Sequence, residues 1–231
     1  MKTNKKILGT SLLVTCLTTT SLFAQAKNFQ GFSLALGASA TSGKNELEGR
    51  LYSINNEQMS ASFDKNNIIP SVDLSYATQS TDKFFISLGV NKDFTKTNLG
   101  KQYFDTNEDN TTVENKLKSH YAMYVQPSYL ISNTSAVFGK ISYNKAKIES
   151  AATGEIDTVT TEVQSKSTHG YGYGLGIKTL INSNFYIQVE AERVNYKSKS
   201  FDPNSSSTGN RADYRIEPST NSGKISVGYK F

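Results

Sequence analysis

The segment "KISVGYKF", Lys224–Phe231, alternates between two kinds of side chain. Ile225, Val227, Tyr229 and Phe231 are apolar, and the residues between them are lysine, serine or glycine. Successive side chains of a β-strand point to opposite faces, so the pattern predicts a strand with one apolar and one polar face. Most domains end in a loose polar tail. We therefore expect this last strand to pair along its whole length.

The same period of two recurs in seven other segments. They are residues 32–40, 68–78, 83–94, 120–130, 136–145, 169–180 and 184–196. In each segment one parity is apolar and the other is mostly small, polar or charged, as expected for strands that separate two environments. No segment shows a helical period, so we predict essentially no regular helix.

The first 26 residues have the pattern of a secretory signal peptide. Three lysines precede an apolar run too short to span a bilayer, and "AQA" (24–26) is a small-x-small cleavage site. We expect a signal peptide at 1–26 and one barrel domain at 27–231. Cys16 lies in the signal peptide, and Thr15 before it argues against lipidation. The mature chain would then have neither a disulfide nor a thiol nucleophile.

Charge and hydropathy exclude two classes of protein. Removing Lys2, Lys5 and Lys6 takes the formal charge from +5 to +2, and no cluster of lysine and arginine remains to suggest nucleic-acid binding. No run of about eighteen apolar residues follows Ala26, so helical membrane spans are not expected.

The connections between the expected strands alternate strictly in length. Three are tight, at 78–82, 132–135 and 182–184, and four are long and polar, at 41–67, 95–119, 146–167 and 198–221. In an up-and-down meander, this alternation places all long connections at one end and all tight turns at the other. Bacterial outer-membrane barrels have this layout, with short periplasmic turns and long external loops.

We therefore predict an all-β fold: an eight-stranded antiparallel up-and-down transmembrane β-barrel with short periplasmic turns and four long extracellular loops. A secreted lipocalin-like barrel also alternates, but its apolar face lines a cavity. The loop alternation and two aromatic girdles on the apolar parity favour the membrane. The expected periplasmic girdle is Phe32, Tyr76, Phe84, Tyr129, Phe185 and Phe231, and the expected outer girdle is Tyr121, Tyr143, Tyr171 and Tyr196.

Over 27–231 the chain resembles the eight-stranded outer-membrane barrels of the OmpA/OmpX and opacity-protein type. The resemblance rests on the architecture and the last strand, and no catalytic motif supports it. In that group, a last strand ending in phenylalanine is similar to the signal read by the barrel-assembly machinery. The resemblance thus implies an assembly signal at Tyr229 and Phe231, a bilayer containing lipopolysaccharide as surroundings, and only the barrel half of an OmpA-like protein.

Eight charged side chains fall on the parity that would face the barrel lumen. They are Asp73, Asp93, Glu190, Glu192, Lys140, Lys178, Lys224 and Lys230. An eight-stranded barrel is just wide enough for its side chains to fill, and buried charges must pair. We favour a structural plug of ion pairs, with a narrow polar path for water or small ions as the alternative.

The run "GYGYGLGIK" (170–178) does not match a phosphate-binding loop, because its glycines alternate strictly and no strand–turn–helix context is present. We interpret it as a strand with a glycine face. That face would point into the lumen and leave room for Tyr124, Phe138 or Tyr186 to cross over.

Three further residues allow more than one interpretation. His120 and His169 could belong to a lipid A-modifying enzyme, but neither lies in a His-x-Ser setting, and a metal site is weaker still. No cofactor is expected. Arg193 could contact lipopolysaccharide phosphates. Alternatively, a β-bulge at Arg193 would turn Val194 and Tyr196 outward, and we slightly favour the bulge.

Together these features predict an integral outer-membrane protein of a Gram-negative bacterium, monomeric by default. The expected role is structural or adhesin-like, through the exposed loops. The alternatives are a small non-specific porin and, less favoured, an enzyme of the outer leaflet. The loops carry no motif from which a ligand could be read.

Overall fold

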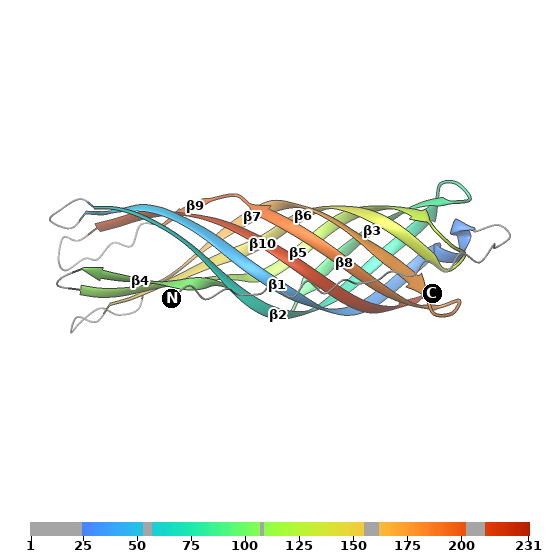
Figure 1. Cartoon of the computed structure of the whole chain (residues 1–231), viewed down its shortest axis with the longest axis horizontal. Helices are drawn as coiled ribbons and strands as arrows, with labels where there is room; N and C mark the ends of the chain where they lie inside the picture. The colour runs from blue at the N-terminus through green and yellow to red at the C-terminus, as the bar shows by residue number, and fades with distance from the viewer. Residues whose placement is uncertain (1–24, 53–56, 107–108, 155–161, 202–210) are drawn as a thin grey trace, which may run out of the picture.

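The computed structural model describes residues 25–52, 57–106, 109–154, 162–201 and 211–231. The expected signal peptide therefore lies outside the described residues, apart from its last two positions. The described chain forms a long closed sheet of antiparallel strands (Figure 1). The strands are β1 (Gly31–Tyr52), β2 (Glu57–Gln79), β3 (Phe84–Asp93), β4 (Thr97–Thr106), β5 (Asp109–Leu130), β6 (Ser135–Gly154), β7 (Glu162–Leu180), β8 (Phe185–Tyr196), β9 (Lys199–Phe201) and β10 (Arg211–Lys230).

The sheet closes into a ring of eight strands. The order is β1-β2-β3-β5-β6-β7-β8-β10, and β10 pairs back onto β1 from Lys230, opposite Ser33, to Arg211, opposite Tyr52. β4 follows β3 after a break at 94–96, and β9 follows β8 in the same way. This confirms the predicted eight-stranded antiparallel barrel. Among the described residues, the only helical element is a single 3-10 turn, η1 (Ala26–Phe29).

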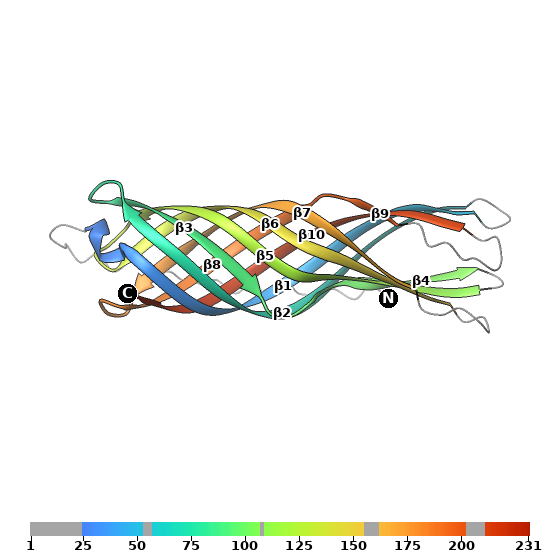
Figure 2. The same cartoon turned by 180° about the vertical axis from the view of Figure 1, so that it is seen from behind.

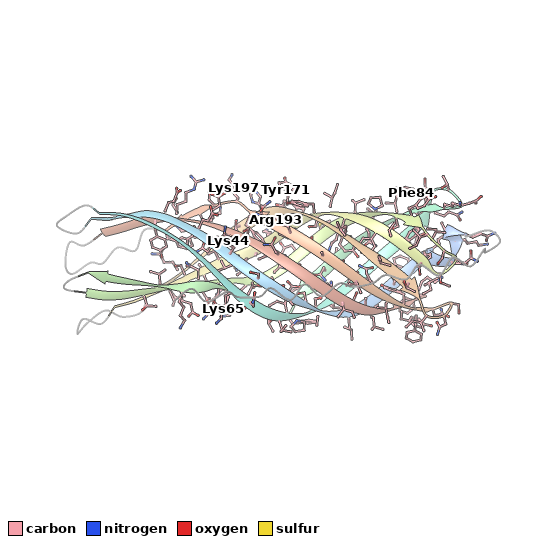
Figure 3. All side chains as sticks on the ribbon, in the orientation of Figure 1. Lys44, Lys65, Phe84, Tyr171, Arg193 and Lys197 are labelled. Atoms are coloured by element: carbon pink, nitrogen blue, oxygen red, sulfur yellow. The ribbon has the colours of Figure 1, made fainter. Side chains whose placement is uncertain are left out.

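Below the head, the strands of the barrel wall are apolar on the outside and mostly polar on the inside. Leu36, Ile141 and Leu175 are 66%, 67% and 69% exposed, whereas inward residues such as Ser87 and Gln126 are each 1% exposed. This is the reverse of a soluble domain, and it requires an apolar solvent around the barrel. Side chains project outward along the whole wall, with Phe84 near one end and Tyr171 nearer the other (Figure 3).

The strands continue far beyond the predicted segments of about ten residues. β1 and β5 each have 22 residues and β2 has 23, so the expected extracellular loops are largely β-structured where described. Pairing of β2 with β3 ends at Ser71, opposite Asp93, and pairing of β7 with β8 ends at Gly170, opposite Tyr196.

Beyond those points the barrel becomes two sheets, β2-β1-β10-β9 and β4-β5-β6-β7, visible as two groups of strands at one end in Figures 1 and 2. Asn67 joins them at one seam, exchanging hydrogen bonds with the backbone of Asn98, and Lys166 donates to the Ser200 carbonyl at the other. We call this part the extracellular head. It comprises the described residues of 43–67, 97–118, 146–168 and 199–220.

In the head the apolar side turns inward. Its core contains Leu99, Val113, Leu117, Ala146, Ile148, Phe201, Tyr214 and Ile216, together with Val194 and Tyr196 from the adjoining end of β8, all nearly inaccessible to solvent. β5 makes the change with an irregularity between Lys118 and Tyr121, where Ser119 has a positive φ of 54°. Leu117 thus points inward, and Tyr121 points outward.

On β8 this inversion corrects one of our expectations. Arg193 of β8 pairs with Tyr173 on β7 and with Asn221 on β10, and the register of both ladders is unbroken there. There is therefore no bulge at Arg193. Val194 and Tyr196 are each 5% exposed and face inward. Tyr196 therefore does not belong to the outer girdle. The apolar residue has changed parity because the strand has left the bilayer and its interior is now the dry side.

The 3-10 turn η1 closes the opposite mouth of the barrel. The Ala26 N–H donates to the Asp82 carbonyl at 2.7 Å, and the Phe29 ring stacks on Phe85 with their centroids 4.9 Å apart. Ala35, Ala77, Leu130, Ala136, Leu180 and Tyr186 complete this apolar layer. The end of β10 lies at the same mouth (Figure 1).

Candidate functional site

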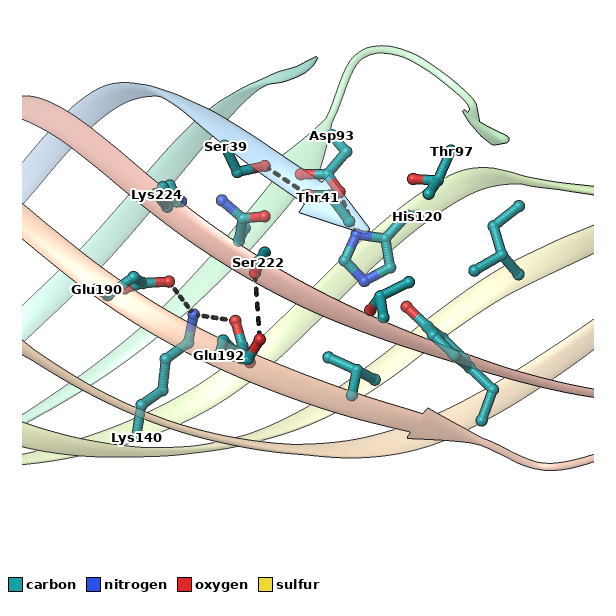
Figure 4. Close-up of a pocket in the computed structure, with 15 residues that line it drawn as sticks. Ser39, Thr41, Asp93, Thr97, His120, Lys140, Glu190, Glu192, Ser222 and Lys224 are labelled. Atoms are coloured by element: carbon teal, nitrogen blue, oxygen red, sulfur yellow. Dashed lines mark hydrogen bonds and ion pairs between the residues drawn. The ribbon is translucent and has the colours of Figure 1, made fainter. Parts of the chain in front are cut away.

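The polar layer of the lumen lies between these two apolar layers and is centred on Lys140 of β6. Its ammonium group lies 2.8 Å from Glu190 and 2.8 Å from Glu192, both on β8 (Figure 4). The three side chains are 4%, 5% and 11% exposed. Removed from water in this way, each charge is compensated by direct contact with its opposite.

The glycine face of β7 makes this contact possible. β7 lies between β6 and β8, with Gly174 opposite both Lys140 and Glu192. Because glycine has no side chain, Lys140 can cross over β7 to the acids on the next strand. Gly176 is covered by Phe138, whose ring would lie 2.4 Å from an added Cβ. The predicted crossing of Phe138 is thus confirmed, whereas Tyr124 and Tyr186 cover Gly89 and Gly228 on other strands.

A chain of hydrogen bonds extends from Glu192 toward the head. Ser142 donates to Glu192 at 2.6 Å, and the amide nitrogen of Asn144 donates to Ser142 at 2.7 Å. The Asn144 oxygen therefore faces His120, whose Nε2 lies 2.9 Å away. The Nδ1 of His120 lies 2.5 Å from an Asp93 carboxylate oxygen. Both ring nitrogens thus face acceptors, and the network is satisfied when His120 is a doubly protonated imidazolium.

Charges in this layer balance. A cavity of about 40 Å³ is lined by Asp93, Glu190 and Glu192, and by Lys140, Lys224 and His120. These are three acids and three cations once His120 is protonated. The cavity has room for about three water molecules.

A second polar group lies nearer the periplasmic layer. The Tyr124 hydroxyl donates to Asp73 at 2.7 Å, and the Lys178 ammonium lies 4.5 Å from the centre of the Tyr186 ring. The ammonium group of Lys140 likewise lies 4.9 Å from the centre of the Tyr124 ring, so both buried lysines make cation–π contacts.

The structure places seven of the eight proposed lumen residues in these two polar groups and the eighth outside them. Lys230 lies at the periplasmic rim, where its ammonium donates to the Asn28 carbonyl at 2.7 Å. His120 was missed as a member of the layer. The available signal was its position on β5. The expected strand begins at His120, and since Tyr121 faces lipid, the neighbouring His120 must face inward.

The proposed assembly residues lie on the outside of the last strand. Tyr229 and Phe231 are 38% and 71% exposed, and their rings meet edge to face at 5.1 Å. The Phe231 N–H donates to the Phe32 carbonyl at 2.9 Å, which extends the seam between β10 and β1.

The fold and its inverted faces define a transmembrane β-barrel with a polar lumen. The chain belongs to the outer membrane protein beta-barrel domain family, whose model matches residues 11–231. It is an outer-membrane barrel of the Gram-negative type. A search among curated proteins finds no significant match.

Comparison with solved structures finds similar outer-membrane proteins at low sequence identity. The outer membrane protease OmpT from Escherichia coli is 9% identical, with a TM-score of 0.51 over 92% of this chain and 99% of that one. Ail, the attachment invasion locus protein of Yersinia pestis, is 13% identical, with a TM-score of 0.41 over 87% and 99%. OprG from Pseudomonas aeruginosa is 11% identical, with a TM-score of 0.45 over 87% and 96%.

Two searches of the described residues found nothing. No group of three or more histidine, cysteine, aspartate or glutamate side chains there is arranged to hold a metal ion. No helix in that part of the chain is long and apolar enough to cross a bilayer.

Proposed function

We propose that the protein is a surface-binding outer-membrane barrel without a conducting lumen or catalytic activity. In this proposal the membrane part is an anchor, and the extracellular head is the part that meets other molecules. The expected porin and enzyme roles become the alternatives against which it is tested.

The head is the observation that carries the proposal. The β1–β10 ladder continues from Lys44, opposite Ser219, to Tyr52, opposite Arg211. The eight residue-to-residue steps between Lys44 and Tyr52, at about 3.4 Å each, extend about 27 Å along the strand. Short turns would be enough to connect transmembrane strands, so this paired, cored structure is not needed for membrane insertion. A rigid platform that positions exposed connections is what a binding surface requires.

The lumen supports the non-conducting part. A permeating ion would have to pass the Phe29–Phe85 stack, the charge-balanced layer around Lys140 and the apolar core of the head. Among the described residues, the cavity of about 40 Å³ between them is large enough only for a few waters.

The two histidines support the non-enzymatic part. His120 lies inside the barrel with both ring nitrogens engaged, whereas His169 stacks on Tyr143 with ring centroids 6.0 Å apart. They lie on opposite faces of the wall. Ser142, close to the His120 network, already donates its hydroxyl to Glu192.

Trimming the head tests the proposal. Replacing 45–64, 98–117, 147–167 and 199–218 by short turns should leave a barrel that still migrates faster unboiled than boiled in detergent gels. Cells producing the full chain should bind to epithelial monolayers or to one another, and cells producing the trimmed chain should not. Equal binding by both, with equal surface amounts, would refute the role of the head.

A further inference from the structure

We propose that His120 is a proton-operated latch between the membrane barrel and the extracellular head. In its doubly protonated form the ring ties β3, β5 and β6 together at the level where the barrel divides into two sheets. Loss of one proton breaks this tie and loosens the base of the head. The inference rests on the position of His120 and not on what the head binds.

His120 lies at the junction between the barrel and the head. β5 changes parity here, and Ser119, directly before His120, has a positive φ of 54°. Asp93 is the last residue of β3, and its pairing with Ser71 is the last one between β2 and β3. Only residues 94–96 separate Asp93 from β4. A contact between His120 and Asp93 therefore fixes the point from which β4 leaves the barrel wall.

The imidazole ring joins three strands through its two nitrogens. The Nδ1 atom lies 2.5 Å from an Asp93 carboxylate oxygen on β3, and the two side chains are turned toward each other in Figure 4. The Nε2 atom lies 2.9 Å from the side-chain oxygen of Asn144 on β6. β3 and β6 flank β5 on opposite sides and do not pair with each other. Since both contacts are to acceptor oxygens, only a ring with two N–H groups makes them together.

A neutral ring has one donor and one acceptor, so one of these two contacts must fail. If Nδ1 keeps its proton, Asn144 has to turn its amide nitrogen toward the ring, and its oxygen then meets the Ser142 hydroxyl. That hydroxyl already donates to Glu192 at 2.6 Å and cannot donate to Asn144 as well. If Nε2 keeps its proton, the Asp93 carboxylate faces a nitrogen lone pair. Deprotonation therefore breaks the network with either tautomer.

The charges around His120 balance only while it is protonated. The titratable and charged side chains that line the same cavity are Asp93 on β3, Lys140 on β6, Glu190, Glu192 and Tyr196 on β8, and Lys224 on β10. The cavity-lining residues of β1 and β4 carry no charge, and neither does Leu117, the other one on β5. A neutral His120 leaves three acids against two lysines in a place largely removed from water, which is unfavourable.

The proton of His120 can exchange with water, because the side chains of His120 and Asp93 are 16% and 17% exposed. The tie forms at mildly acidic pH, where the ring carries both protons. It is lost as the pH rises through the pKa that His120 has in the folded barrel. The base of the head should therefore be tight in mildly acidic surroundings and loose in alkaline ones.

The two histidines of the chain allow a matched test. His120→Gln removes the latch, and His169→Gln removes the outward-facing histidine with the same change of charge. The barrel would be refolded in lipid nanodiscs without a histidine tag. NMR of the ring nitrogens would follow both histidines from about pH 5 to about pH 10. Hydrogen-exchange mass spectrometry over the same range, corrected for the intrinsic pH dependence of exchange, would report backbone protection.

In wild type we expect protection of 93–98 and 117–121 to fall about tenfold as His120 titrates, the effect of losing one charge-assisted hydrogen bond. Protection of 84–90, within the membrane wall, should not change. His169→Gln should keep the pH dependence, whereas His120→Gln should show low protection of the junction at every pH. If His120→Gln does not refold, Asp93→Asn should give the same constant low protection.

Four results would overturn the latch. They are an unchanged pH dependence in His120→Gln, its loss in His169→Gln, wild-type protection that stays constant while His120 titrates, and a His120 ring that keeps one protonation state over the whole range.

Discussion

At the scale of single residues, the glycines of the wall are of two kinds. A Cβ at Gly176 would lie 2.3 Å from the Val189 carbonyl oxygen and 2.4 Å from the Phe138 ring, whereas a Cβ at Gly223 would meet nothing within 4 Å. We therefore expect Gly176→Ala to lower the free energy of unfolding by about 1–3 kcal/mol, the usual cost of overpacking. Gly223→Ala should leave it unchanged. Urea unfolding of barrels inserted in lipid vesicles measures both, and equal stability of the two variants would contradict the crossing of β7 by Phe138.

Removal of the Lys140 side chain should also destabilise the barrel, because it leaves two buried carboxylates without a partner. Lys140→Met would leave Glu190 and Glu192 buried and unneutralised, which should cost about 3 kcal/mol or more in the same unfolding measurement. Adding Glu190→Gln and Glu192→Gln to that variant should restore most of the loss. A structural ion-pair layer predicts this rescue. If the triple variant were no more stable than Lys140→Met alone, the layer would not be holding the barrel together.

Phe231 contributes little packing to the finished barrel, since it is 71% exposed and its ring contacts only Tyr229 among the described aromatic rings. We expect Phe231→Ser to reduce the amount of protein in the outer membrane of cells while detergent refolding remains near normal. Comparison of outer-membrane yield with refolding yield separates the two effects. The reverse result would contradict recognition by the assembly machinery.

At the scale of elements, the head is held at its β4–β5–β6 face by Glu149, which pairs with Lys96 at 3.1 Å and with Lys118. Hydrogen bonds from Lys118 and Lys96 hold the pKa of Glu149 below its ordinary value. A carboxylate with a lowered pKa in the folded state stabilises that state above the ordinary glutamate pKa, and the contribution is lost as the pH falls through the lowered value.

Acidification below about pH 4 should therefore increase hydrogen exchange in the upper parts of β4, β5 and β6 before it affects the membrane strands. Glu149→Gln should give the raised exchange already at neutral pH and remove that part of the pH dependence. Hydrogen-exchange mass spectrometry resolves the two regions. Identical pH profiles for wild type and variant would show that Glu149 is not the responsible group.

The sequence predicted the membrane strands well because one physical rule governs them. Between the girdles every outward residue meets lipid, so the period of two is strong in segments such as 32–40 and 224–231. In the head and at the adjoining end of β8 the rule reverses, and Leu117, Val194 and Ile216 are apolar on the side that faces inward. When the apolar residues move from the outward to the inward positions of a strand, the period of two is interrupted. The sequence of these stretches therefore predicts loops and not strands.

The same reversal explains why two predictions were wrong: the place of Tyr196 in the outer girdle and the bulge at Arg193. The lumen charges could be named because their parity is fixed, but their partners could not. Pairing of Lys140 with Glu190 depends on side chains that cross an intervening glycine strand. The inward parity of His120 can be read from the sequence, but its hydrogen bond with Asn144 depends on the orientation of that amide in the three-dimensional network.

At the scale of the whole molecule, the barrel and its two-sheet head together enclose three stacked layers. The Phe29–Phe85 layer and the head core are apolar, and the charge-balanced layer lies between them. A polar lumen wall is compatible with a pore, whereas apolar layers at both ends favour the proposed anchor. The central claim is therefore that the barrel anchors a binding head and does not conduct.

Planar-bilayer recording tests that claim most directly. Wild-type protein, shown to be folded by its faster migration when unboiled, should give no stable unit conductance, and Glu190→Gln should be equally silent. A reproducible unit conductance in wild type that changes with Glu190→Gln would contradict the account and show that the layer around Lys140 lines an open path.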